Sequence, residues 1–340
     1  MPRTLGRRGM VAGLLVLAAA AAACGGGGGG EQAGSDAGMA AEIKGLDNPF
    51  FVTMRQGLVE TAGRRRVRLS VGSAASLDDT VGQASSMEAL AGQGAGCYIV
   101  NPIDATNLIQ PLTHVPPGVP IVNIDSPIDR AAARAAGVRI GTYIGTDNVS
   151  AGRLAAATMA RRVPRGARVA VIEGIPGDAT SKARARGFQQ GAPGRFIVVH
   201  TVPADFDRRE AAAAARHLLQ SDRRLGGIFA VNDEMALGVV DATTRGAARR
   251  KVAVIGLDGI PDALRAIRRG ALTATVSQYP YTIGQLAVEA CAAHLRGIRV
   301  PAKIDAPVQL VDAGNVARAL ARFPRPVAAF RDRLATALAR

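Results

Sequence analysis

The chain has 340 residues, of which 48% are hydrophobic and 20% are charged, so it forms a packed core and is not an intrinsically disordered protein. Three cysteines in a chain of this length exclude a disulfide-stapled miniprotein, and no Cys and His cluster has the spacing of a zinc site. A formal net charge of +15 would suit nucleic acid or a membrane. Because arginines scattered among alanines carry nearly all of it, we interpret it as a compositional feature, not a binding patch.

The chain opens with a targeting segment. Arginines at positions 3, 7 and 8 precede the apolar run Met10–Ala23, which is shorter than the about twenty residues of a membrane-spanning helix. Small residues directly before Cys24 resemble a bacterial lipobox, and a run of glycines follows. We therefore expect residues 1–23 to be a lipoprotein signal peptide, Cys24 to carry lipid, and residues 24–38 to be a Gly-rich tether. An ordinary secretory signal with an incidental cysteine is the alternative.

Short apolar runs then recur along the chain, each about as long as a buried parallel strand. They are Met39–Ile43, Val67–Val71, Cys97–Val100, Val119–Ile124, Val169–Ile172, Phe196–Val199, Gly227–Val231, Val252–Ile255 and Leu272–Val276. Segments with helical spacing lie between them, and several begin after an Asp, Asn or Ser cap. This alternation predicts an α/β fold with parallel sheets covered on both faces. The units are too many for one sheet, so we expect two doubly wound lobes.

Two details of this pattern carry expectations of their own. Glu42 interrupts the first apolar run, which places this strand at a sheet edge or makes it weak. Cys97 lies in an apolar run and Cys291 in an Ala-rich helical stretch, so both are expected to be buried single thiols.

Polar side chains follow strand after strand. Ligands of such sheets bind beyond the carboxyl ends of the strands, where these side chains would gather. Asn and Asp are also common turn and cap residues, but their recurrence at successive strand ends, beside aromatic residues, favours a binding site. The residues concerned are Asn48, Asn101, Asp125, Asn232, Asp258 and Gln278, with Phe50, Phe51 and Phe206.

The sequence offers no catalytic device. It contains neither a G-x-S-x-G elbow nor a Walker loop, its four histidines lack ligand or triad spacing, and its Gly-rich stretch at 92–96 precedes a strand. We therefore expect no enzyme activity, no cofactor and no metal. Carboxylates and carboxamides beside flat rings suit a neutral polyhydroxylated molecule, with Asp125 and Asp258 accepting from hydroxyls and Arg184 donating. A secreted enzyme that uses Asp125 and Asp258 as paired carboxylates is an alternative.

Four ordered segments resemble bacterial ribose-binding proteins, the extracytoplasmic solute-binding subunits of sugar ABC transporters. The similarity runs from about Met39 to Asp312. It implies two doubly wound α/β lobes joined by three hinge crossings (the periplasmic binding protein type I fold), with the sugar between them. The segments read DNPFF from Asp47, PADFDR from Pro203, NDEMALG from Asn232 and GLDG from Gly256.

The resemblance also implies a ligand-binding set drawn from both lobes, in which Phe50 or Phe51 and Phe206 sandwich the sugar ring. Lys44 stands where ribose binders have a small hydroxyl residue and is closer to the allose-binding branch, whereas Asn101 agrees with the ribose type. Ser126 replaces an arginine of the ribose binders, so the pocket is a hybrid. The implied set is Lys44, Asn48, Phe50, Phe51, Asn101, Asp125, Arg184, Phe206, Asn232, Asp258 and Gln278.

The same resemblance divides the chain. We expect an N-terminal lobe of residues 39–146 plus 279–307 and a C-terminal lobe of residues 147–278 plus 308–315. Residues 316–340 lie beyond the family pattern and are expected to form a helical extension, in which Val327, Phe330, Leu334 and Leu338 share one face. The extension is a helix packed on the body, a frayed segment, or a basic amphipathic helix that lies on anionic lipid.

These features predict a cell-membrane-anchored lipoprotein that works outside the cytoplasm. It would capture a monosaccharide or polyol, ribose, allose or a related compound, and deliver it to an ABC transporter permease. It would touch the membrane only through its lipid and would not bind nucleic acid. A sugar-sensing receptor subunit for a chemotaxis or signalling partner is an alternative. A sugar-responsive repressor would need an N-terminal helix-turn-helix, where this chain has a signal segment and glycines.

Overall fold

A computed structural model describes residues 38–244 and 252–339 of the chain. The predicted signal peptide, Cys24 and nearly all of the predicted tether therefore lie outside the described residues. Among the described helices, none is both long enough and apolar enough to cross a bilayer.

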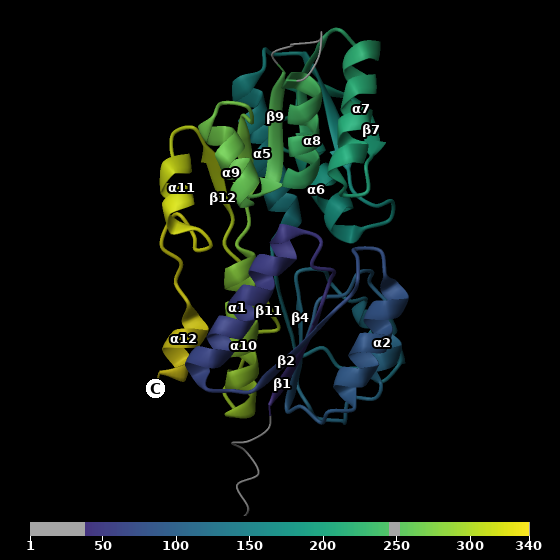
Figure 1. The fold of residues 1–340 in the computed structure, drawn as a ribbon, viewed down its shortest axis with the longest axis vertical. Helices are drawn as coiled ribbons and strands as arrows, with labels where there is room; N and C mark the ends of the chain where they lie inside the picture. The colour runs from purple at the N-terminus through teal and green to yellow at the C-terminus, as the bar shows by residue number, and fades with distance from the viewer. Residues whose placement is uncertain (1–37, 245–251, 340) are drawn as a thin grey trace, which may run out of the picture. The chain divides into compact units, whose positions relative to one another are not determined.

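The described strands form two sheets (Figure 1). The first has the order β11-β5-β4-β3-β1-β2, and all of its pairings are parallel. The second has the order β12-β10-β9-β8-β6-β7, with β12 antiparallel to β10 and the other pairings parallel. The first sheet comprises β1 (Met39–Ile43), β2 (Leu69–Ser73), β3 (Cys97–Val100), β4 (Ile121–Ile124), β5 (Thr142–Gly145) and β11 (Lys303–Asp305). The second comprises β6 (Ala167–Glu173), β7 (Phe196–Pro203), β8 (Leu225–Ala230), β9 (Ala253–Asp258), β10 (Ala274–Ser277) and β12 (Gln309–Asp312).

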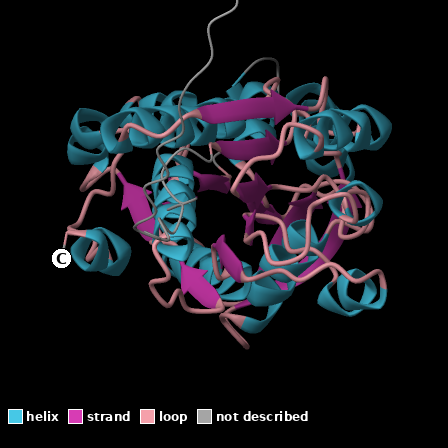
Figure 2. Cartoon of the chain, turned by 90° about the horizontal axis from the view of Figure 1, so that it is seen from below, coloured by secondary structure: helices cyan, strands magenta, loops and turns pink. Residues whose placement is uncertain are grey.

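Helices connect the strands and lie around both sheets (Figure 2). We call the first sheet with its helices the first lobe, and the second sheet with its helices the second lobe. Within the body that ends at β12, the chain passes between the lobes after β5, after β10 and after β11. Two doubly wound α/β lobes with three crossings confirm the predicted fold class. The helices of the first lobe are α1 (Pro49–Arg65), α2 (Thr80–Ala91), α3 (Ile109–Leu112), α4 (Arg130–Ala135) and α10 (Pro280–Leu295). Those of the second are α5 (Asn148–Arg162), α6 (Ala179–Gln190), α7 (Arg208–Ser221), α8 (Asp233–Thr244) and α9 (Pro261–Arg268).

Glu42 does not lie where the sequence predicted. Strand β1 is flanked by β3 and β2, so it is not an edge strand, and it pairs along its length on both sides. The Glu42 carboxylate is fully buried and accepts a hydrogen bond from Ser86 Oγ at 2.6 Å. Burial raises its pKa to about 7. Gly72, its partner on β2, makes room for the carboxylate, because a Cβ there would collide with it.

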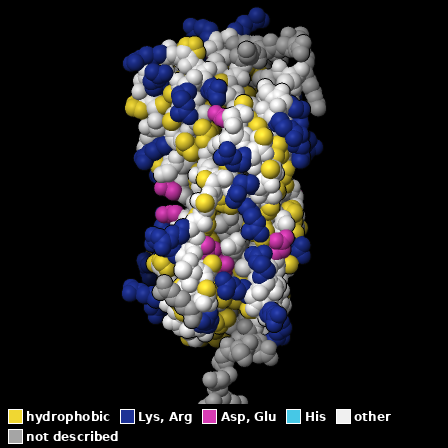
Figure 3. Space-filling view, turned by 90° about the vertical axis from the view of Figure 1, so that its left-hand side faces the viewer, with side chains coloured by type: hydrophobic (Ala, Val, Ile, Leu, Met, Phe, Trp, Pro, Cys, Tyr) yellow, Lys and Arg dark blue, Asp and Glu magenta, His cyan; other side chains and the backbone are white. Residues whose placement is uncertain are grey.

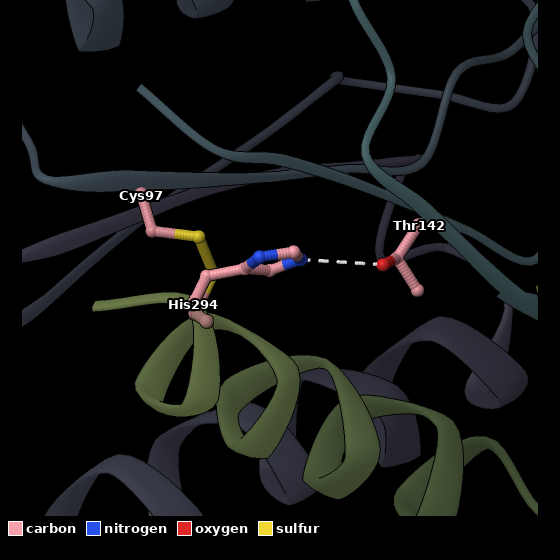
Figure 4. Close-up of a disulfide and its surroundings, with 4 residues drawn as sticks. Cys97, Thr142 and His294 are labelled. Atoms are coloured by element: carbon pink, nitrogen blue, oxygen red, sulfur yellow. Dashed lines mark hydrogen bonds between the residues drawn. A yellow bond between two sulfur atoms is a disulfide. The ribbon is translucent and has the colours of Figure 1, made fainter. Parts of the chain in front are cut away.

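The expectation of two single thiols is also wrong. Cys97 on β3 and Cys291 on α10 form a disulfide between positions 194 residues apart (Figure 4). His294, one turn further along α10, contacts Thr142 Oγ1 with its Nε2 at 3.3 Å. The bond fastens β3 to α10, the helix by which the chain re-enters the first lobe after β10. The residues next to each cysteine in the sequence indicate only that it is buried. The two become partners because α10 packs against the sheet of the first lobe, 194 residues further along the chain.

The C-terminal segment packs on both lobes. Helix α11 (Val316–Arg322) buries Val316 in the core of the second lobe, and α12 (Arg333–Leu338) buries Leu334 and Leu338 in the core of the first. The single expected helix is wrong, because Val327 and Phe330 precede α12 and pack on different lobes. The apolar side chains of the extension therefore face the protein. Lys and Arg side chains on the outer face near this segment are spread among uncharged ones (Figure 3).

Replacing both disulfide cysteines tests the long-range link. We expect Cys97→Ala/Cys291→Ala to lower the free energy of unfolding by about 2–5 kcal/mol, because the crosslink no longer restricts the unfolded chain. Urea unfolding of the variant and the wild type measures the difference. Reductant should bring the wild type to the midpoint of the variant, whereas equal midpoints for the oxidised wild type and the variant would contradict the disulfide.

Candidate functional site

A cavity opens at the carboxyl ends of the strands and is lined by residues of both lobes. Its space, including the opening to solvent, is about 500 Å³. The loop between β1 and α1 contributes Lys44 and Asn48, the first turn of α1 contributes Phe50 and Phe51, and the ends of β4, β8 and β9 contribute one side chain each. Most of the residues predicted from the sequence therefore meet here. They are Lys44, Asn48, Phe50, Phe51, Asp125, Arg184, Phe206, Asn232 and Asp258.

Two predicted residues stand behind the lining. Asn101 is fully buried, and its Oδ1 accepts from the backbone amide of Ser126 at 3.4 Å. Gln278 is buried after β10 and donates from Nε2 to Asp258 Oδ1 at 2.7 Å. Gln278 thus contacts the lining residue Asp258 directly, whereas Asn101 contacts the backbone of Ser126, the neighbour of the lining residue Asp125.

Five lining residues of the cavity were not predicted from the sequence. Asp178 caps α6 by accepting from the amide of Ser181 at 2.7 Å, and it faces the cavity with Thr180. Asp178 could have been predicted, because it is a helix-cap residue in the loop after β6, and ligands of such sheets bind beyond the carboxyl ends of the strands. The apolar lining residues Leu77, Ile103 and Ile175 gave no such signal.

Arg184 is the most constrained side chain of the site. It is buried on α6, and its Nε donates to Asn148 Oδ1 at 2.8 Å. Its Nη1 donates to the carbonyl of Val231 at 2.9 Å and lies 3.5 Å from Asp258 Oδ1. A guanidinium bound on several sides is held in one orientation, so its remaining donors have fixed directions.

The acidic groups of the cavity are easily neutralised. Burial raises the pKa of Asp258 to about 8, although Arg184 opposes the shift. Burial likewise raises the pKa of Asp125, against the effect of Lys44 and Arg184. The ammonium of Lys44 lies 5.7 Å from the centre of the Phe51 ring, within cation–π range.

Three lining residues other than glycine have positive φ angles. They are Asp125 at 59°, Phe206 at 60° and Asp258 at 139°. Each such backbone costs on the order of 1–3 kcal/mol and persists where the surrounding structure fixes it. The strain is concentrated at the cavity and directs these side chains into it. A two-lobed body with a strained, polar and aromatic cleft between the lobes defines a solute-binding protein.

Comparison with known proteins gives the family. A sequence profile described as a periplasmic binding protein domain matches residues 42–299. The chain is 36% identical over 268 residues to the ribose import binding protein of Bacillus subtilis (strain 168), covering 78% of this chain and 84% of that protein. It is 32% identical to the D-allose-binding periplasmic protein of Escherichia coli (strain K12), covering 72% and 80%.

Solved structures agree with this assignment. A solute-binding protein of Actinobacillus succinogenes 130z with bound D-allose has a TM-score of 0.77 at 29% identity, covering 83% of this chain and 99% of that one. The Caulobacter myo-inositol binding protein has a TM-score of 0.74 at 31% identity, covering 84% and 96%. The chain belongs to the periplasmic binding protein family, among the sugar-binding subunits of ABC transporters. This is a family of transport proteins and not of enzymes, and membership implies an extracytoplasmic location.

The raised pKa of Asp258 predicts a pH-dependent stability difference. Between the ordinary pKa of 3.8 and about 8, the folded protein keeps a proton on Asp258 that the unfolded chain has lost, so wild-type stability falls as pH rises through this window. Asp258→Asn, which stays neutral, should therefore gain in melting temperature relative to the wild type as pH rises from 5 to 9. Asp129→Asn, at an exposed helix cap with a lowered pKa, is the control and should show a constant difference above pH 6. A constant difference for Asp258→Asn as well would contradict the assignment.

Proposed function

We propose that this chain is a lipid-anchored extracytoplasmic protein that captures a monosaccharide or polyol between its lobes and delivers it to an ABC permease. The observation that carries the proposal is the cavity itself, in which hydrogen-bonding side chains and aromatic rings converge from both lobes. Relatives named for ribose and D-allose, and structures solved with D-allose and myo-inositol, support this class of solute.

Each lining residue has a role that suits its chemistry. Asp125 and Asp258 accept from solute hydroxyls, and Lys44 and Arg184 donate to solute oxygens. The carboxamides of Asn48 and Asn232 can donate, because each uses its oxygen to cap a helix. The rings of Phe50 or Phe51 and of Phe206 cover the C–H faces of the solute. Asn101 and Gln278 stand behind the lining, so we propose that they act through Ser126 and Asp258.

Closure follows from the division of these residues between the lobes. Asp125 belongs to the first lobe, whereas Arg184 and Asp258 belong to the second, and only the closed form brings both sets onto one solute. An affinity in the micromolar range or tighter corresponds to roughly −8 kcal/mol or beyond. We place the lobe boundaries at 39–146 plus 279–307 and at 147–278 plus 308–315. These bounds agree with the sheet to which each strand belongs.

The anchor and the location rest on separate observations. The lipobox-like sequence at Cys24 supports lipidation, although this residue lies outside the described part of the chain. The disulfide between Cys97 and Cys291 supports an extracytoplasmic location, because such bonds persist in oxidising compartments and are rare in the cytosol.

A solute screen tests the function. Thermal melts with pentoses, hexoses, 6-deoxyhexoses, polyols and inositols should show a rise in melting temperature with at least one compound, because binding stabilises the native state. Calorimetry with that compound should show that Asp258→Ala abolishes binding, since buried solute hydroxyls lose their hydrogen-bond acceptor. Asp129→Ala, away from the cavity lining, should bind as the wild type does. Unchanged affinity of Asp258→Ala would refute the role of Asp258.

Detergent partition tests the anchor. Wild-type protein expressed in a bacterium that processes lipoproteins should enter the detergent phase of a Triton X-114 separation and incorporate a labelled fatty acid. The Cys24→Ser variant should do neither. Recovery of both proteins in the aqueous phase without label would exclude the lipid anchor and leave the solute-binding proposal untouched.

A further inference from the structure

Asp233 is a fully buried carboxylate that the binding site does not expose. It is the first residue of α8 and does not line the cavity. The sequence motif that begins at Asn232 includes it, but the proposed function uses only the asparagine. A buried carboxylate with no role would be costly, so its partners identify its task.

Asp233 has three hydrogen-bond partners, and two of them lie on the turn that follows Asp258. Its Oδ2 accepts from the backbone amides of Gly259 at 2.6 Å and Ile260 at 3.0 Å. Its Oδ1 accepts from Thr275 Oγ1 on β10 at 2.7 Å. Gly256 leaves space beside this oxygen, because a Cβ there would collide with it. The carboxylate therefore fills a pocket built for it behind β9.

The turn that Asp233 holds is strained. Asp258 has φ 139° and Gly259 has φ 78°, so two consecutive residues adopt positive φ angles. Any side chain at Gly259 would also collide with Ser277 Oγ. A turn of this kind persists only when the structure around it fixes it, and the two amides bound by Asp233 directly follow Asp258. The same turn brings the Asp258 carboxylate to Arg184 and Gln278 at the cavity.

We propose that Asp233 is a positioning residue for solute binding: its carboxylate holds the amides of Gly259 and Ile260 and thereby fixes the Asp258 carboxylate in the cavity. The proposal rests on the proposed function, because it is measured through solute affinity. It adds to that function a buried acid that touches no solute.

The charges around Asp258 make the pH dependence of solute affinity a useful measurement, because a purely structural role of Asp233 would leave that pH dependence unchanged. Arg184 from α6, Asp125 after β4 and Asp233 from α8 are the charged groups that face it, with the uncharged Gln278 amide after β10. Glu234 in turn faces Asp233. Burial raises the pKa of Asp258 to about 8, Arg184 lowers it, and the like charge of Asp233 raises it. Two backbone amides and the Thr275 hydroxyl donate to the Asp233 carboxylate and lower its pKa, against the burial that raises it, so these contacts favour the ionised form that carries the like charge.

Two substitutions separate position from charge. In Asp233→Asn the amide oxygen can still accept from the two backbone amides, and its NH₂ can donate to Thr275 Oγ1, so the turn is kept while the charge is lost. Asp233→Ala loses both. Wild-type affinity should rise with pH toward about 8, because ionised Asp258 is the stronger acceptor. For Asp233→Asn this rise should occur at lower pH, with wild-type affinity at pH 9. For Asp233→Ala affinity should fall roughly tenfold or more at every pH.

The experiment is calorimetric titration, from pH 5 to 9, with the compound that the solute screen identifies. Asp129→Ala is the matched control, because Asp129 also accepts from two backbone amides but does not line the cavity. It should bind as the wild type does at every pH. Far-UV circular dichroism checks folding. If Asp233→Ala does not fold, Thr275→Val removes one hydrogen bond of the Asp233 carboxylate and should weaken binding, by less than the roughly tenfold loss expected for Asp233→Ala.

The outcomes that overturn the inference are distinct from failure of the proposed function. A folded Asp233→Ala within twofold of wild-type affinity overturns the positioning role. An unchanged pH profile for Asp233→Asn overturns the coupling to Asp258. A wild type that binds no compound of the screen overturns the proposed function, and this inference with it.

Discussion

The second lobe is arranged around one buried guanidinium. Arg184 is bound by Asn148 at the start of α5, by the carbonyl of Val231 after β8 and by Asp258 at the end of β9. Burying a cation is costly unless its hydrogen bonds are made, so three separate loops must keep their positions for Arg184 to stay inside. The same loops present Asn232 and Asp258 to the cavity. Burying Arg184 therefore costs the lobe some folding free energy, and it fixes the donors and acceptors of the cavity before a solute binds.

The first lobe is built from separate stretches of chain, because most of the second lobe, from α5 to β10, lies between them in the sequence. Helix α10 returns to it from far along the sequence, and close contact with α1 depends on Gly57 and Gly284, where any side chain would meet the backbone of the other helix. The disulfide between Cys97 and Cys291 fastens this returning helix to β3. The C-terminal segment then adds apolar side chains to both cores, with Leu334 in the first and Val316 in the second.

The sequence could predict what depends on local pattern. Alternating apolar runs and capped helices predicted the fold class. Polar residues at strand ends predicted Asn48, Asp125, Asn232 and Asp258 of the cavity lining, because parallel strands bring their carboxyl ends to one edge, whereas Lys44 came from the family resemblance. What it missed depends on distant partners. The pairing of Cys97 with Cys291 needs the path of the chain, and the burial of Glu42 needs both Ser86 and the space at Gly72. The apolar spacing from Val327 onward predicted one helix, but Val327 packs on the core of the second lobe, whereas Phe330, Leu334 and Leu338 pack on the core of the first.

The charges in the cavity also bear on the kind of solute. Lys44 and Arg184 supply two cationic groups to the lining, and Asp125, Asp178 and Asp258 supply the acidic groups that oppose them. A charged solute would leave one of these buried groups facing a like charge or lacking its partner, and both are costly in a cavity from which water is excluded. A neutral polyhydroxylated solute avoids this penalty, because a hydroxyl can donate to a carboxylate and accept from a cation at once. The protonation of Asp258 then adjusts the strength of the acceptor without changing the class of solute.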